Sequence, residues 1–304
     1  MIERGERAAR ERKMSNLFDL LVAGLATGAI YALVAVGFTL LWQTSQTINF
    51  AQGEFVMLPA FLMLAAMHVG APFWLASILG ILLSMILLGL AFKMLLVDPM
   101  MRHGVLPLAI ATMALAIGMK EAVKQFFSAE ASPFPSIVPT GDISVLGHAV
   151  SLQSLGVLVV AILAVLCLTT LLNRTSLGHQ MQAAAQNPTV ARIIGVPVER
   201  MILLTFLINA FLVALASLLI TPIYLAKFSS GEVLGQAAFI AAIVGGFNQV
   251  RGAIIGGLLI GVLDNLAAAY VSTQYRAAVP MIFLIAVILF RPQGLLGRAE
   301  ERTV

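Results

Sequence analysis

The sequence predicts an all-α, polytopic integral membrane protein with about eight to nine transmembrane helices, some of them short or broken. Of its 304 residues, 60% are hydrophobic and 11% are charged, and the mean hydropathy is +1.00. Soluble domains carry about 25% charged residues. The apolar residues also gather in blocks of roughly 20, the length that crosses ~30 Å of hydrocarbon at 1.5 Å per residue.

Nine apolar segments follow one another and are expected to enter or cross the membrane. In chain order they are Leu17–Trp42, Glu54–Val69, Phe73–Val97, Val105–Phe127, Leu152–Asn173, Met201–Ala226, Leu234–Phe247, Gly252–Val271 and Arg276–Phe290. The second is short and contains Pro59. Lys93 and the group Lys120, Glu121 and Lys124 lie near span ends, where snorkelling to the interface is expected.

Loop charges set the orientation of such a bundle. Ala129–Val150 has no Lys or Arg and is expected outside, whereas Arg174–Arg200 and the tail after Phe290 carry arginines and are expected in the cytoplasm. Counting back through nine spans puts the N-terminus outside, which conflicts with the five basic residues before Met14. The net charge of +4 therefore indicates orientation and not nucleic-acid binding.

That conflict leaves two interpretations of residues 1–13, a charged helical extension or an artefact of the start site. Residues 14–297 are expected to form a single transmembrane domain that includes the loop 174–200, followed by a cytoplasmic tail over 298–304.

Two segments of the chain resemble each other. Phe50–Glu54 and Phe228–Glu232 both read F-x-x-G-E, 178 residues apart, and Leu106-Pro107 has a counterpart in Val279-Pro280 at a similar offset. Because five spans separate the two copies, the second copy is inverted. Inverted repeats with short, interrupted helices recur in transporters. The alternative is chance similarity in a chain made of few residue types.

The most polar stretch at the bilayer edge is Gln43–Glu54, which leads into the short second span. Backbone exposed there must bond to protein or water. We expect a broken helix lining a polar path, with Asn49, Gln52 and Glu54 facing the cavity. The alternative is an interfacial loop whose Glu54 caps the next helix.

Asp264-Asn265 lies inside the glycine-rich eighth span. An unpaired carboxylate there costs about 2.5–3.5 kcal/mol, so Asp264 must face protein or water. Both residues are candidates for the translocation pathway, and the alternative is that Asp264 ties helices together.

No catalytic set is visible, so we expect neither an enzyme nor a cofactor or metal site. The four histidines lack metal-ligand spacing and there is no Walker-type loop for ATP. The single cysteine, Cys167, can form no internal disulfide.

The loop Arg174–Arg200 predicts two short helices separated by Asn187-Pro188, with Gly195 and Pro197 ending the second. Val190, Ile193 and Ile194 give the second helix an apolar edge. This edge either rests on the protein's own transmembrane helices or in the membrane interface, or it serves as a peg for a partner protein.

The segment INFAQGE (Ile48–Glu54), the loop pattern R-T-S-L-G…A-A-x-N-x-x-x-A-x-x-x-G-V and the closing RPQGLLG together resemble the permease subunit of branched-chain amino acid ABC importers. The resemblance extends from Met14 to Gly297. Gln182-Ala183 stands where relatives often have Arg-Ala, and Gln52 where His is frequent.

The resemblance implies a complex in the bacterial inner membrane with two ATPase subunits, a second and related permease subunit, and a periplasmic binding protein. It implies that Asn187–Gly195 is the coupling helix that docks on an ATPase. The positions that match the coupling pattern are Gly178, Ala184, Asn187, Ala191 and Gly195, and Gly53 with Glu54 marks the broken helix.

Two other functions compete with import of branched-chain amino acids. The first alternative is the same architecture moving urea, short amides or a sugar. An ion-coupled secondary transporter working alone would use Asp264 and Glu54 as proton sites, but it has no need of an exposed docking helix.

Overall fold

The computed structural model describes residues 2–46, 48–127, 130–139, 141–145 and 148–297. It confirms an all-α, polytopic membrane protein. Six helices among the described residues are long and apolar enough to cross a membrane: Leu17–Ser45, Phe73–Met101, Val105–Phe127, Leu152–Arg174, Val198–Tyr224 and Val250–Tyr270.

The elements follow the predicted segments closely. They are α1 (Ile2–Ser45), α2 (Gln52–His68), α3 (Phe73–Ser84), the π-helical η1 (Met85–Ala91) and η2 (Lys93–Val97), α4 (Asp98–Met101), α5 (Val105–Phe127), β1 (Asp142–Val145), β2 (His148–Ser151), α6 (Leu152–Arg174), α7 (Ser176–Gln186), α8 (Pro188–Ile193), α9 (Val198–Tyr224), α10 (Ser230–Gly245), α11 (Val250–Tyr270) and α12 (Ala278–Phe290). With 17, 16 and 13 residues, α2, α10 and α12 are too short to cross ~30 Å of hydrocarbon without tilt or help.

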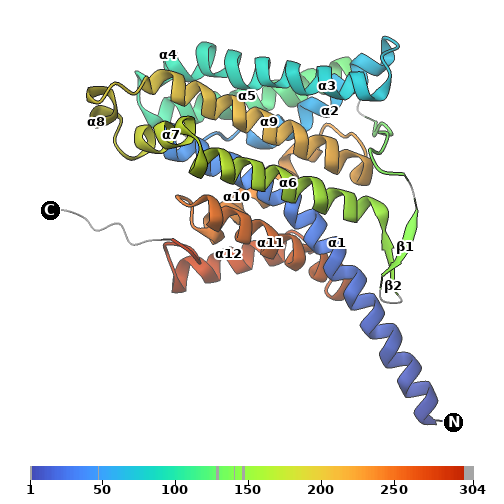
Figure 1. Cartoon of the computed structure of the whole chain (residues 1–304). Coiled ribbons are helices and arrows are strands. Elements are labelled where there is room, and N and C mark those ends of the chain that lie inside the picture. Colours follow the sequence, from blue (N-terminus) through green and yellow to red (C-terminus); the bar gives the residue numbers. More distant parts are fainter. Residues whose placement is uncertain (1, 47, 128–129, 140, 146–147, 298–304) are drawn as a thin grey trace.

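Different helices and strands lie at the two ends of the bundle (Figure 1). The β1–β2 hairpin and the start of α1 lie at one end, here called the hairpin face, and α4, α7 and α8 lie at the other, here called the α8 face. The chain from residue 2 onward continues α1 beyond the hairpin face.

The hairpin was not predicted. It pairs Asp142 with Ser151 and Ile143 with Val150 in antiparallel register, inside the loop that lacks basic residues. The segment before it is fastened to the bundle because Ser132 and Ala226 exchange two backbone hydrogen bonds of 2.9 Å.

The internal repeat is visible in the elements. The helices α2 and α10 begin at Gln52 and Ser230, at the offset of 178 residues found in the sequence. The helices that precede them, α1 and α9, run in opposite directions through the bundle. The two copies are therefore inverted relative to each other, and the first turns of α2 and α10 meet inside the protein.

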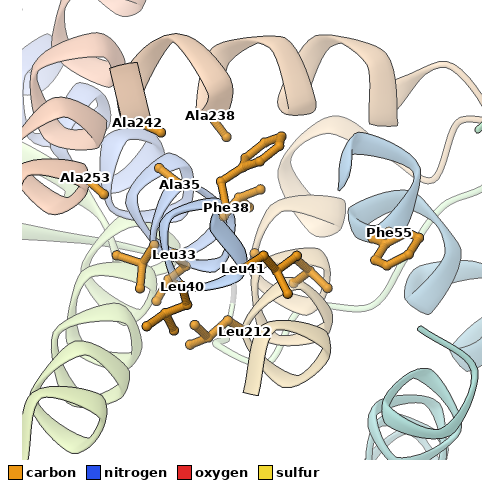
Figure 2. Close-up of a cluster of buried hydrophobic side chains, with 14 of the residues drawn as sticks. Leu33, Ala35, Phe38, Leu40, Leu41, Phe55, Leu212, Ala238, Ala242 and Ala253 are labelled. Atoms are coloured by element: carbon orange, nitrogen blue, oxygen red, sulfur yellow. The ribbon is translucent and has the colours of Figure 1, made fainter. Parts of the chain in front are cut away.

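The core is centred on α1, around which side chains from α9, α10 and α11 converge (Figure 2). Phe38 extends toward Ala238 of α10, and Leu33 and Leu212 are each at most 2% exposed. Small residues let α1 and α11 approach closely, as is common between helices in lipid. A Cβ on Gly28 would lie 2.8 Å from the Cα of Leu258.

Candidate functional site

The centre of the candidate site is the junction where the first turns of α2 and α10 meet. A Cβ on Gly53 would overlap the carbonyl oxygen of Gly231, and a Cβ on Gly235 would lie 2.6 Å from the Cα of Gly53. No residue other than glycine fits at this contact without a shift of backbone. Gly53, selected from the sequence as part of the broken helix, is thus the point where the two repeats touch.

Glu54 lies at the same junction and is 6% exposed. Its carboxylate abuts Gly231, where a Cβ would fall 2.9 Å from Glu54 Cδ, and within the described structure its Oε2 has no hydrogen-bond partner. It occupies the first turn of α2 and faces the first turn of α10. The partial positive charges of both helix N-termini favour a carboxylate at this position.

Asn49 and Gln52 are buried in a polar network and line neither of the two cavities described below. Gln52 Nε2 donates to Asn209 Oδ1 at 2.6 Å, and Asn209 Nδ2 donates back to Gln52 Oε1 at 3.2 Å. Asn49 Nδ2 donates to the same Gln52 oxygen at 3.3 Å. The network ties the chain before α2 to the middle of α9, so it satisfies buried polar groups.

A cavity of about 380 Å³, within the range of small-molecule sites, is lined by the end of α9 and by Ala226, which pairs with the segment before the hairpin. We call it the outer cavity after the orientation that the loop charges lead us to expect. Its walls are largely apolar and come from α2, α9 and α10, among them Met57, Phe61, Ile220 and Leu234. Its polar lining includes Tyr31, Thr221, Tyr224, Lys227, Ser229, Ser230, Asp264 and Arg276. A cavity of this kind suits a small amphipathic solute.

Asp264 lines the outer cavity, and both of its carboxylate oxygens have hydrogen-bond partners there. Arg276 binds it through two contacts of 2.5 Å, from Nε to Oδ1 and from Nη2 to Oδ2, and Tyr31 Oη donates to Oδ2 at 2.9 Å. Arg276 Nη2 also donates to Tyr224 Oη at 2.9 Å. The hydrogen bonds to Asp264 raise the pKa of Arg276 above its usual value, so the guanidinium stays charged. The cluster joins α1, α9, α11 and the α11–α12 loop.

Asn265, the other candidate in the eighth span, does not line the outer cavity. Its Nδ2 donates to the carbonyl oxygen of Gly261, one turn earlier in α11, at 3.0 Å. Arg276, Tyr31, Tyr224 and Asn209 were missed by the sequence analysis. The signal that was available is chemical: a buried carboxylate requires a cation, and Arg276 is the nearest basic residue after Asp264 in the chain.

An inner cleft of about 1030 Å³ opens on the α8 face. The start of the polar stretch lies here, with Gln43, Thr44 and Gln46 in its lining, and Gln43 Nε2 donates to the carbonyl oxygen of Asn248 at 2.6 Å. The polar stretch therefore runs from the inner cleft through the Asn49–Gln52 network to the α2–α10 junction.

The predicted coupling residues divide into two groups. Gly178, Ala184 and Ala191 face inward and are buried. Asn187 and Gly195 form the ends of α8: Asn187 Oδ1 accepts from the amides of Thr189 and Val190 at 3.1 and 3.0 Å, and Gly195 ends the turn at φ +87°.

Three apolar residues of α8 and its end reach solvent, beside the exposed Thr189 and Arg192. Val190, Ile193 and Ile194 are 50%, 79% and 68% exposed. The described helices therefore leave at least half of each of these side chains uncovered.

Two lysines expected to snorkel are paired instead. Lys93 is buried and its Nζ lies 2.8 Å from both carboxylate oxygens of Asp98. Lys120 Nζ lies 2.8 Å from Oε2 of Glu232, the repeat partner of Glu54. Because Glu232 lies within reach of Lys120, this lysine has an anion within the protein.

Comparison with known proteins gives matches over nearly the whole chain. Residues 20–290 match the family described as the branched-chain amino acid transport system / permease component. The permease protein BraD of the high-affinity branched-chain amino acid transport system of Pseudomonas aeruginosa is 31% identical over 93% of this chain and 97% of its own length. LivH of Salmonella typhimurium, named for the same kind of system, is 30% identical over 92% of this chain and 96% of its own.

A sugar permease matches less of the chain. The ribose import permease protein RbsC of Bacillus subtilis is 32% identical, over 44% of each chain. No solved structure matches significantly. The match to the family model and the similarity to BraD both cover most of this chain, which therefore belongs to the family of branched-chain amino acid transport system permease components.

Proposed function

We propose that this chain is the membrane-spanning permease subunit of an ATP-binding-cassette importer for branched-chain or related hydrophobic amino acids. In this proposal it works in the bacterial inner membrane with two separate ATPase subunits, a second permease subunit and a periplasmic binding protein. The observation that carries the proposal is similarity over more than nine-tenths of the chain to permeases named for this transport.

The shape of α8 supports an ATPase partner. A six-residue helix with an apolar, exposed end is costly in water unless a partner covers it. Asn187 caps its start and Gly195 follows its end, and Ala191 is 2% exposed, which holds the helix against the bundle. A rigidly held apolar helix suits the helix-in-groove mode of recognition.

The two cavities support a path for solute. The outer cavity is lined by Val56 and Ser230, next to the α2–α10 junction, and the inner cleft is lined by Gln43, Thr44 and Gln46 of the polar stretch before α2. In the proposed mechanism, ATP closes the ATPase dimer, the docked α8 helices move with it, and the open side of the permease changes. Full switching from 1:99 to 99:1 needs a preference of about 5.5 kcal/mol for one state.

Co-purification after tagging the C-terminus, with uptake of labelled leucine in the same strain, tests the proposal directly. We expect an ATPase subunit to be recovered and leucine uptake to require ATP and this chain. Recovery of the ATPase without leucine uptake would move the substrate to urea, amides or a sugar. Absence of any ATPase after mild solubilisation would favour an ion-coupled transporter.

A matched pair of glycine variants separates docking from folding. Gly195→Arg is expected to abolish uptake and to lower recovery of the ATPase while the protein still inserts. Gly70→Arg is the control, because Gly70 also has positive φ (+94°) and an open position for a side chain, but lies between α2 and α3. Normal uptake by Gly195→Arg would contradict the docking role of α8.

A further inference from the structure

The π-helical stretch between α3 and α4 connects elements that are otherwise separate. Lys93 and Asp98 are five residues apart, the spacing that a π-helix brings together. The side chain of Lys93 is 7% exposed, and its Nζ also lies 4.0 Å from Oε2 of Glu199 at the start of α9. The other carboxylate oxygen of Glu199 accepts from Arg192 Nη2 of α8 at 3.1 Å.

Charges thus link α8, α9 and η2 at the α8 face. The contact between Arg192 and Glu199 is exposed and screened by salt, so it adds little by itself. The backbone adds a second link, because Val196 N donates to the carbonyl oxygen of Ala191 at 2.9 Å in the turn between α8 and α9. A displacement of α8 therefore reaches the start of α9 and the buried Lys93.

Next to Lys93, an aromatic chain crosses the bundle. The ring centroid of Phe92 lies 5.9 Å from that of Phe206 in α9 and 4.8 Å from that of Phe55 in α2, the latter edge to face. All three side chains are at most 6% exposed. Gly89 of η1 brings the backbone directly onto α9, since a Cβ there would lie 3.1 Å from the Cα of Leu207.

Phe55 follows Glu54 in the first turn of α2, so the aromatic chain ends at the α2–α10 junction. Close-packed side chains transmit displacement because no void absorbs it. π-Helical turns are rare and cluster at functional sites.

We infer that Phe92 and Lys93 are positioning residues that carry the movement of α8 to the α2–α10 junction. Lys93 fixes η2 to the base of α9, and Phe92 passes the displacement from Phe206 to Phe55. This inference rests on the proposed function, since it needs an ATPase that moves α8.

The experiment measures leucine delivered per ATP hydrolysed in proteoliposomes that contain the whole complex and its binding protein. Phe92→Leu and Lys93→Met are each expected to lower this ratio about fivefold, within the range seen for residues along coupling networks. The amount of bound ATPase and the rate of hydrolysis are expected to stay near the wild-type values. Lys93→Arg keeps the charge and is expected to restore the ratio.

Phe134→Leu is the matched control, a buried aromatic side chain that contacts Phe73 outside this route. A role in folding alone would lower the yield of both variants without changing the ratio. An unchanged ratio in Phe92→Leu and Lys93→Met, or an equal fall in Phe134→Leu, would overturn the inference. If Phe92→Leu does not fold, the leucine-per-ATP ratios of Lys93→Met and Lys93→Arg test the inference. Wild-type complex without an ATPase would contradict the proposed function itself.

Discussion

Asp264 and Glu54 are both carboxylates buried in an apolar bundle, yet their surroundings differ. Asp264 has a guanidinium and a phenol as partners, whereas Glu54 lies at two helix N-termini and its Oε2 has no hydrogen bond within the described structure. The sequence identified both residues because a carboxylate in a hydrophobic run is costly. It left their roles open, because the partners of Asp264 come from positions 233 and 12 residues away.

Removing one member of the Asp264–Arg276 ion pair is expected to destabilise the protein more than removing both members. Arg276→Met leaves a buried, uncompensated carboxylate and should lower the free energy of unfolding by about 3–5 kcal/mol. The double variant Arg276→Met, Asp264→Asn should recover much of that loss. Thermal unfolding in detergent measures both. A double variant as unstable as the single one would contradict the pairing. Lys124→Met, which breaks an exposed ion pair, is the control.

Neutralising Glu54 tests whether its carboxylate at the α2–α10 junction contributes to transport. Glu54→Gln keeps the shape but removes a charge that two helix N-termini favour, an effect of about 1–2 kcal/mol. We expect leucine uptake to fall about fivefold or more, because 1.4 kcal/mol corresponds to a factor of ten. Lys124→Gln, at an exposed and less constrained charge, should transport normally. Equal effects of the two substitutions would remove the functional distinction of Glu54.

At the scale of elements, small residues determine how closely the helices pack. Gly28→Val in α1 would press against the backbone of α11, where a Cβ already lies 2.8 Å from Leu258 Cα. Overpacking of this kind costs about 1–3 kcal/mol. Gly118→Val in α5 is the control, since nothing lies within 4 Å of that position. Thermal unfolding should show a loss of stability for Gly28→Val and none for Gly118→Val. Equal stability of the two variants would show that the contact between α1 and α11 is looser than described.

The sequence predicted most helix boundaries within a few residues because apolar runs and Asn, Pro and Gly at their ends are local signals. Val105–Phe127 was predicted with the bounds that α5 has. The hairpin and the π-helical turns were not predicted. Both depend on contacts elsewhere: the segment before the hairpin pairs with Ala226, and η1 packs onto Leu207.

At the scale of the whole molecule, orientation is testable. Loop charges predict that the hairpin face is periplasmic and the α8 face cytoplasmic. Alkaline phosphatase, which is active only in the periplasm, should be active when inserted at Gly141 and inactive when inserted at Ile194. The reverse pattern would invert the proposed topology and remove α8 from reach of an ATPase.

The sequence alone determined that this is a polytopic membrane protein and predicted a small helix flanked by Asn187 and Gly195, because composition, length and capping residues act locally. Only the tertiary structure decided that Gly53 meets Gly231, that Arg276 neutralises Asp264, and that Asn49 and Gln52 form an internal network with Asn209. These contacts join segments from 12 to 178 residues apart. Helix packing decides which of these side chains meet, and local sequence signals do not reveal how the helices pack.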